Sequence, residues 1–262
     1  MICKQLENGK YPLVLLHGWG LNSAVWQLLM DDLAPHFDVI CIDLPGFGFN
    51  HQVVPQPYSL DAVVEQIAPL CPPNSIVLGW SLGGMVATKL AVNYPDKVAQ
   101  LCLVASSPCF VEQTACAEQA DWPGVKAQVL AGFSTALQDN AKRTIERFMA
   151  IQTMGSPSAK QDVKWIKQAV FSQPDADMLA LVGGLAILND EDLRAPLQQL
   201  KIPVRGIYGA NDTLVPAKGV QQLGLQMADF ACAIINKASH APFISHREAF
   251  VRQFLAYNST FI

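Results

Sequence analysis

Residues 75–93 read SIVLGWSLGGMVATKLAVN, and this stretch decides the fold. Its first five residues form a short apolar run that predicts a buried strand, and the residues from Leu82 onward predict a helix. The motif G-x-S-x-G lies between them at residues 79–83, with Ser81 at its centre. A serine at such a strand-turn-helix junction occupies a sharp, strained turn in which only very small neighbours leave room. We therefore predict that Ser81 is a nucleophile whose hydroxyl projects above a sheet.

The sequence on both sides of this turn alternates between short apolar runs and stretches with helical spacing. Strands are expected at residues 11–16, 38–44, 75–79, 100–105, 203–208 and 230–235, and helices at residues 21–33, 59–70, 82–93 and 249–257. Continuous apolar strands that alternate with helices are typical of a parallel sheet covered on both faces. The fold class is therefore α/β.

One long stretch interrupts this alternation. From about residue 110 to residue 190 we find amphipathic helical segments, punctuated by proline and glycine, and no convincing strand. A chain of 262 residues suits one large domain with a small insertion. We predict an α/β core formed by residues 1–109 and 191–262, with residues 110–190 inserted as a helical cap over the sheet.

The bulk composition excludes several classes of partner. The formal net charge is −4 and the pI is about 5.7, so the whole chain has no bulk attraction for nucleic acid or an anionic membrane. The apolar residues 75–92 are interrupted by Ser81, a glycine pair and Lys89, which favours buried structure over a membrane span. A chain of this size with a capped site can work as a monomer, and a monomer is our expectation.

The cysteines indicate the compartment. Their number is odd, they lack the paired short spacing of a zinc site, and several lie inside apolar runs. We expect free, buried thiols and hence a reducing compartment. The polar N-terminus does not resemble a signal peptide, so a cytoplasmic location is expected. The cysteines are Cys3, Cys41, Cys71, Cys102, Cys109, Cys116 and Cys232.

A serine hydroxyl needs a base to take its proton, and His240 is our candidate. It follows the last expected strand, at the sheet edge where the active sites of such folds assemble. His246 lies six residues later beside Arg247 and Glu248, and we interpret it as a solvated helix cap. His17 is assigned a structural role instead, because it stands in the loop HGWG near the expected oxyanion site.

The acid that orients the base should lie between the serine and the histidine in chain order. Asp212 does so, in the loop GANDTLVP after the strand at 203–208. Asp43 is the main alternative, but it precedes Ser81 and also fits a structural carboxylate that fixes the turn at Pro45 and Gly46. Asp190 and Asp192 lie in a charged connection and are expected to face solvent.

A tetrahedral intermediate needs two aimed hydrogen-bond donors. The backbone N–H of Leu82 is one, at the positive end of the helix that follows Ser81. The loop after the first apolar strand supplies the other, and we take it to be the N–H of Trp19. Trp19 and Trp80 also fit as the lining of the substrate pocket, with plain core aromatics as the alternative.

Several longer motifs resemble one enzyme family along nearly the whole chain. The sequence resembles the pimeloyl-[acyl-carrier protein] methyl ester esterases of biotin synthesis, which are α/β-hydrolases. The resemblance extends through the cap, where α/β-hydrolases usually diverge. Its motifs are LLHGWGLNSAVW (15–26), DLPGFG (43–48), LGWSLGGMVA (78–87), DWPGVKAQVLAGF (121–133), RTIERFMAIQTMG (143–155), IYGANDTLVP (207–216) and ASHAPFISH (238–246).

The resemblance implies a function and a set of site residues. Members of this family release methanol from the methyl ester of a pimeloyl group carried on acyl-carrier protein, and they need no cofactor. The resemblance also implies an α/β-hydrolase fold, the triad and both oxyanion donors named above, and an apolar pocket. The implied residues are Ser81, Asp212 and His240 for the triad, Trp19 and Leu82 for the oxyanion hole, and Trp19, Trp80, Phe133 and Phe148 for the pocket.

The expected cap is basic although the chain is acidic. Residues 142–167 hold six basic and two acidic residues, and the basic ones recur at helical spacing. Such a face would attract an acidic carrier protein, although charge runs are usually only solvated surface. With the resemblance we favour docking of the carrier protein by Arg143, Arg147, Lys160 and Lys164. The family has arginine at two of these positions, where Lys160 and Lys164 lose the bidentate geometry and weaken the contact.

Some features leave alternatives open. Residues 111–121 form a longer segment than the family pattern suggests, and their role is unknown. The same triad would serve a general short-chain carboxylesterase, a thioesterase or a C–C bond hydrolase. A binding protein on a hydrolase scaffold is the alternative outside the enzymes. Dehalogenases and epoxide hydrolases are disfavoured, because they place an aspartate where this chain has Ser81.

Overall fold

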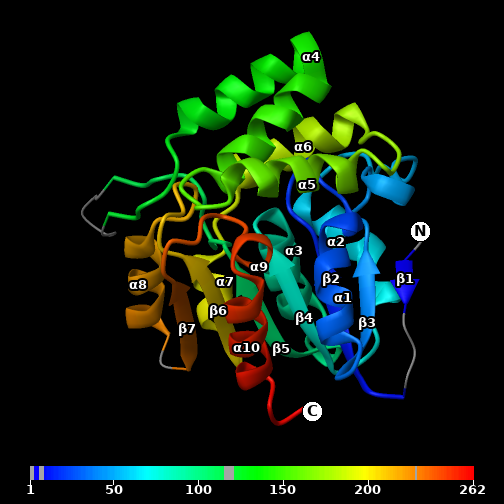
Figure 1. Ribbon diagram of the computed structural model, residues 1–262, viewed down its shortest axis with the longest axis vertical. Helices are drawn as coiled ribbons and strands as arrows, with labels where there is room; N and C mark the ends of the chain where they lie inside the picture. The colour runs from blue at the N-terminus through cyan, green and yellow to red at the C-terminus, as the bar shows by residue number, and fades with distance from the viewer. Residues whose placement is uncertain (1–2, 6–8, 115–120, 228) are drawn as a thin grey trace.

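The computed structural model describes residues 3–5, 9–114, 121–227 and 229–262, and it is built around one twisted sheet (Figure 1). The strand order is β1-β3-β2-β4-β5-β6-β7. Only the edge strand β1 runs antiparallel to its neighbour, and the other six strands are parallel. The strands are β1 (Cys3–Gln5), β2 (Tyr11–Leu16), β3 (Phe37–Ile42), β4 (Ser75–Trp80), β5 (Val98–Val104), β6 (Val204–Gly209) and β7 (Phe230–Ile235).

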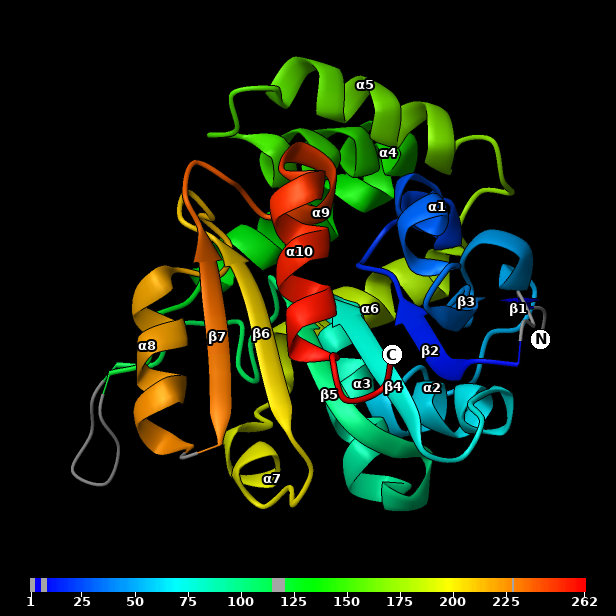
Figure 2. The ribbon, with the colours of Figure 1, turned by 60° about the horizontal axis from the view of Figure 1, so that its bottom comes forward.

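Helices cover both faces of this sheet, as the sequence predicts. Figure 2 shows α1 (Met30–Leu33) and α10 (Arg247–Tyr257) on one face and α3 (Leu82–Asn93) on the other. Next to them, α2 (Leu60–Ile67) packs on α3, α7 (Arg194–Gln198) also contacts α3, α8 (Ala217–Gln226) packs on β7, and α9 (Pro242–Ser245) leads into α10. This coverage explains why every residue of β4 is buried.

The helix expected at residues 21–33 is different in the structure. A 3₁₀ segment, Ser23–Leu29, leads into the four-residue α1. The side chain of Asn22 accepts a hydrogen bond from the N–H of Ala24 at 3.2 Å and caps the segment. The apolar spacing was correctly assigned to a helix, but spacing does not distinguish the tighter 3₁₀ turn from an α-helix.

Three further helices lie beyond the carboxyl ends of the parallel strands (Figures 1 and 2). They are α4 (Ala127–Thr153), α5 (Ala159–Val170) and α6 (Met178–Asp190), and α4 contacts both of the others. Asn140 breaks α4 with non-helical angles, φ −159° and ψ 95°. Its side chain accepts a hydrogen bond from the N–H of Arg143 at 2.9 Å, so Asn140 is the N-cap of the second half. The helix α4 therefore consists of two helical limbs, one before and one after Asn140.

The long segment before α4 folds back on itself in its described part. Isolated bridges join Val111 to Val125 and Gln113 to Trp122, whereas residues 115–120 lie outside the described part. The indole of Trp122 donates a hydrogen bond to the carbonyl of Cys109 at 2.8 Å. These contacts keep the segment on the outer edge of the sheet beside α8, where Gln222 bonds to the carbonyl of Asp121 at 2.9 Å.

The described cysteines agree only in part with the expectation of buried thiols. Cys41, Cys71, Cys102 and Cys109 are buried, but Cys232 on the edge strand β7 is exposed. Burial raises the pKa of Cys102 to about 12, which keeps it a thiol near neutral pH. The predicted state of Cys116 lies outside the described residues, as does the side chain of Cys3. Among the described helices, none is long and apolar enough to cross a membrane.

Candidate active site

Ser81 occupies the turn between β4 and α3 in a strained backbone conformation. Its φ is 55° and its ψ is −120°, a combination that residues with a side chain rarely adopt. Two neighbours hold it there. The N–H of Ser81 donates to the carbonyl of Val104 at 3.0 Å, and the hydroxyl of Ser106 donates to the carbonyl of Ser81 at 2.7 Å. The strain is therefore fixed by the adjacent strand β5.

The glycines of the motif are required by the space around this turn. A Cβ atom on Gly79 would overlap the backbone of Gly83. One on Gly83 would overlap the carbonyl oxygens of Leu16 and His17. The first turn of α3 thus lies directly against the end of β2, which explains why the sequence motif indicates this geometry.

The predicted acid and base lie together above the carboxyl ends of β6 and β7. Nδ1 of His240 is 2.8 Å from Oδ2 of Asp212, and both side chains are buried. The other carboxylate oxygen, Oδ1, accepts the N–H groups of Leu214 and Val215 at 2.8 and 3.0 Å. Because a carboxylate can only accept, Nδ1 carries the proton and Nε2 is left as the basic nitrogen.

Trp80 connects this pair to the serine turn. Its indole N–H donates to the carbonyl of His240 at 2.8 Å, and the two rings lie 6.0 Å apart. Nε2 of His240 is buried and has no hydrogen-bond partner among the described residues. The bond from Ser81 to Nε2 is therefore not closed in this structure, as is common for such sites without substrate. The pocket-lining role predicted for Trp80 stays a prediction, because its ring also packs on Phe243 at 4.9 Å.

Both expected oxyanion donors lie next to Ser81. Leu82 is the first residue of α3, so its N–H has no acceptor within the helix. The loop that carries Trp19 runs past the serine, because a Cβ on Gly18 would lie only 3.3 Å from the Cβ of Ser81. The indole of Trp19 donates to the carbonyl of Leu181 in α6 at 2.8 Å, which anchors this loop to that helix.

An aromatic cluster closes the site on the side of Trp19. Trp19 packs edge-on against Phe148 at 4.9 Å and against Phe133 at 6.3 Å, and the two phenylalanines lie 5.4 Å apart. They come from the two limbs of α4. All three are nearly inaccessible to solvent, as is Ser81 at 1 % exposure. The structure thus brings Phe133 and Phe148 into contact with Trp19, in the loop that runs past Ser81, and buries all of them.

The residues that were weighed as alternatives have other partners. His246 pairs with the hydroxyl of the adjacent Ser245 at 2.9 Å. Asp43 accepts the N–H groups of Ser23 and Phe49 at 2.6 and 3.0 Å, so its carboxylate fixes two loops rather than a histidine. Asp192 forms an ion pair with Arg194. These contacts support His240 and Asp212 as the acid-base pair.

Gln152 is a residue of the site that the sequence did not single out. It is fully buried near the end of α4, and its carbonyl accepts both the N–H of His240 at 3.1 Å and the hydroxyl of Ser239 at 2.9 Å. Its side-chain amide has no partner among the described residues. Its spacing of four residues from Phe148 was the available signal, because both then lie on one face of α4.

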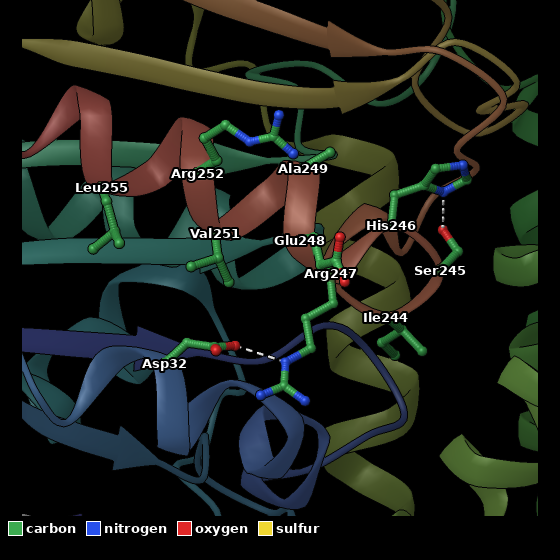
Figure 3. Close-up of a pocket in the computed structure, with 10 residues that line it drawn as sticks. All are labelled: Asp32, Ile244, Ser245, His246, Arg247, Glu248, Ala249, Val251, Arg252 and Leu255. Atoms are coloured by element: carbon green, nitrogen blue, oxygen red, sulfur yellow. Dashed lines mark hydrogen bonds and ion pairs between the residues drawn. The ribbon is translucent and has the colours of Figure 1, made fainter.

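A separate open groove lies on the outer surface between α1 and α10, as Figure 3 shows. Apolar residues such as Ile244, Val251 and Leu255 contribute to its lining, and Arg247 forms an ion pair with Asp32 at 2.6 Å. Positive and negative side chains alternate along its walls, and the triad does not contribute to its lining. The groove therefore offers no charge of one sign to a ligand and is not part of the catalytic site.

Comparison with known proteins agrees with this geometry. A model of the alpha/beta hydrolase fold matches residues 11–247. The chain is 44% identical over 249 residues to a pimeloyl-[acyl-carrier protein] methyl ester esterase of Pectobacterium atrosepticum, covering 95% of this chain and 94% of that protein. It is 47% identical over 251 residues to the enzyme of the same description from Klebsiella pneumoniae, covering 96% and 95%. The chain belongs to this esterase family within the α/β hydrolases.

The family and fold predicted from the sequence are thus confirmed. Among solved structures, an esterase from Exiguobacterium antarcticum has a TM-score of 0.84 with 21% identity, covering 97% of this chain and 94% of that one. At that identity the likeness describes the α/β-hydrolase fold alone. The family is therefore shown by the relatives that match along nearly the full length, and not by the shared fold.

We predict that Asp212→Asn lowers kcat by about 10³- to 10⁴-fold, measured with a small p-nitrophenyl ester. An asparagine oxygen can still accept the N–H groups of Leu214 and Val215. Its NH₂ group would face His240, force Nδ1 to accept, and leave Nε2 protonated and unable to act as a base.

Asp43→Asn is the matched control, since it makes the same change in the alternative acid. It is expected to reduce thermal stability with less than about a ten-fold loss of kcat, because Asp43 holds loops and does not contact the base. A larger loss of kcat from Asp43→Asn than from Asp212→Asn would show that the acid has been misassigned.

Proposed function

We propose that this protein hydrolyses the methyl ester of pimeloyl-[acyl-carrier protein] to pimeloyl-[acyl-carrier protein] and methanol, as an esterase of biotin synthesis. The observation that carries the proposal is the similarity to enzymes of that description along about 95% of the chain. The matched region includes residues 110–190, which we propose to act as a cap. The buried acid-base pair beside a strained serine provides the chemistry.

In the first half of the reaction, Nε2 of His240 takes the proton of Ser81 as Oγ attacks the ester carbonyl carbon. The carbonyl electron pair moves to oxygen, where the N–H groups of Trp19 and Leu82 stabilise the negative charge. The tetrahedral intermediate collapses, the bond to the methoxy oxygen breaks, and methanol leaves with the proton from His240. Asp212 remains ionised and holds the imidazolium in place.

In the second half, water enters the position that methanol has left. His240 takes a proton from this water, whose oxygen attacks the acyl carbon bound to Ser81. The bond between Ser81 Oγ and the acyl carbon then breaks, and Oγ recovers its proton from His240. The product is the free carboxylate on the carrier-bound chain.

The cap interior suits an unbranched acyl chain. Trp19, Phe133 and Phe148 present an apolar surface to its methylene groups, which leave water on binding. The backbone carbonyl of Gln152 accepts the N–H of His240, and its buried side-chain amide has no partner among the described residues. This amide therefore has both a donor and an acceptor to offer to a polar group of the bound substrate. A buried amide without a partner is costly, so substrate binding would also relieve that cost.

The four basic residues predicted to dock the carrier protein are all exposed, and none forms an ion pair within the described part of the chain. The two acidic residues of this region are engaged elsewhere. Glu146 pairs with Lys167 at 3.0 Å, and the buried Asp162 accepts the hydroxyls of Ser156 and Ser158. The positive charge of Arg143, Arg147, Lys160 and Lys164 is thus available to an acidic partner.

Arg147 also places this basic face next to the acyl pocket. Its guanidinium lies over the ring of Phe133 at 5.8 Å from the centroid. One aromatic ring therefore separates a proposed docking residue from the interior cluster around Trp19. This arrangement supports a substrate that is held outside by its carrier and inserts only its acyl arm.

We predict that Ser81→Ala abolishes turnover of both carrier-bound and small esters while thermal stability changes little. The alanine removes only the nucleophilic oxygen from a turn that β5 still holds. The melting temperature and the hydrolysis rates of the purified variant provide the measurement. A variant that keeps the wild-type rate would mean that another residue is the nucleophile.

We predict that Arg143→Glu combined with Arg147→Glu lowers kcat/KM for pimeloyl-[acyl-carrier protein] methyl ester by about ten-fold or more, because it reverses the charge that the carrier meets. A short p-nitrophenyl ester, which needs no docking, should be hydrolysed at least as fast as by wild type. If neither substrate is affected, the basic face is only solvated surface, and the activity is that of a general carboxylesterase.

Salt provides an independent test on the wild-type protein. Raising NaCl from roughly 0.05 to 0.5 M should lower kcat/KM for the carrier-bound ester by about ten-fold, since it shortens the range of charge attraction. The rate with the small ester should hardly change. Equal sensitivity of both substrates would count against the docking face.

A further inference from the structure

His17 is a fully buried histidine whose two ring nitrogens both have backbone partners. Nε2 accepts the N–H of Leu44 at 2.9 Å, and Nδ1 lies 2.8 Å from the carbonyl oxygen of Gly18. Leu44 belongs to the loop after β3, whereas Gly18 precedes Trp19 in the loop after β2. The imidazole therefore connects two loops at the carboxyl end of the sheet.

These two partners determine where the proton is. A backbone N–H can only donate and a carbonyl oxygen can only accept, so Nε2 is unprotonated and Nδ1 carries the hydrogen. An imidazolium would place a second hydrogen against the N–H of Leu44. Burial lowers the pKa of His17, although the nearby Asp43 acts in the opposite direction. The ring is therefore a neutral donor toward Gly18.

We propose that His17 is a positioning residue for the oxyanion hole, acting through the peptide group between Gly18 and Trp19. The carbonyl that accepts from His17 and the N–H proposed to bind the oxyanion belong to that one peptide group. A hydrogen bond to the carbonyl fixes the plane of the group and increases the positive charge on its N–H. The inference rests on the proposed acyl transfer at Ser81 and deepens it.

The surroundings of His17 favour this role over simple packing. The carbonyl oxygen of His17 lies so close to Gly83 that a Cβ there would overlap it, which places His17 against the first turn of α3. The loop of Leu44 is itself fixed, because Asp43 accepts the N–H of Phe49 and the side chain of Asn50 donates to the carbonyl of Asp43. A fixed loop thus holds the ring, and the ring holds the peptide group.

Two isosteric variants separate positioning from structure. In His17→Asn the side-chain NH₂ group occupies the place of Nδ1 and can still donate to Gly18, but the acceptor for Leu44 is lost. In His17→Gln the side-chain oxygen occupies the place of Nε2 and can accept from Leu44, but the donor to Gly18 is lost. Each variant gives up one buried hydrogen bond, so we expect similar losses of stability.

With a short p-nitrophenyl ester, His17→Gln should lower kcat by about ten-fold while KM stays within about two-fold of wild type. That loss is smaller than the hundred-fold or more for removal of a whole oxyanion donor, because Trp19 keeps its N–H. His17→Asn should keep kcat within about three-fold of wild type. Equal losses of kcat in the two variants, or a wild-type kcat in His17→Gln, would overturn the proposal.

An alkyl trifluoromethyl ketone tests the same point at equilibrium. Ser81 Oγ bonds to its carbonyl carbon, the carbonyl electron pair moves to oxygen, and the serine proton passes to His240. The adduct resembles the tetrahedral intermediate, so His17→Gln should weaken its binding by the same factor as kcat/KM. Undiminished affinity in His17→Gln would contradict a role at the oxyanion.

The wild-type protein allows a test that needs no variant to fold. With ¹⁵N-labelled histidine, two-bond NMR correlations should identify His17 as neutral with its hydrogen on Nδ1 throughout the pH range in which the enzyme is active. A hydrogen on Nε2, or an imidazolium, would refute the argument. None of these measurements needs the carrier protein. If the protein fails to hydrolyse the carrier-bound ester but Ser81 still hydrolyses small esters, the proposed substrate is wrong, and the role of His17 can still be tested.

Discussion

The left-handed backbone of Ser81 is the constraint on which the rest of the site depends. It lets α3 start at the next residue, so the N–H of Leu82 lies directly beside the serine and has no acceptor within the helix. The conformation is costly in isolation. The end of strand β5 and the residues that follow it offset that cost, since Val104 and Ser106 both bond to the backbone of Ser81. The neighbouring strand end therefore holds the nucleophile in its conformation.

The inserted helices are hydrogen-bonded to the same site. Near the end of α4, the carbonyl of Gln152 accepts a hydrogen bond from the N–H of His240. In the loop after α4, the carbonyl of Gly155 accepts one from the side chain of Asn211 at 2.9 Å. Base, acid loop and cap thus share hydrogen bonds.

Local patterns made much of this predictable from the sequence. The strand at 230–235 and the helix at 82–93 were predicted with the bounds that the structure has, because apolar runs and a glycine turn mark them. Strand β1 was missed, since three residues at a sheet edge carry no apolar period. The break at Asn140 was missed because asparagine is tolerated inside helices. Gln152 was missed because its importance arises from contacts with a residue 88 positions away, His240.

The residues proposed to carry out the reaction and those proposed to select the substrate lie in different parts of the fold. The serine turn, the acid-base pair and the His17 loop lie at strand ends, where the chain must follow the sheet, so their positions are common to the fold. The predicted pocket residues Phe133 and Phe148 and the basic face come from the two limbs of α4 and from α5, which belong to the inserted helices and not to the sheet. Arg147 over Phe133 is where the two meet. A change there would alter which esters reach Ser81 without altering how Ser81 reacts.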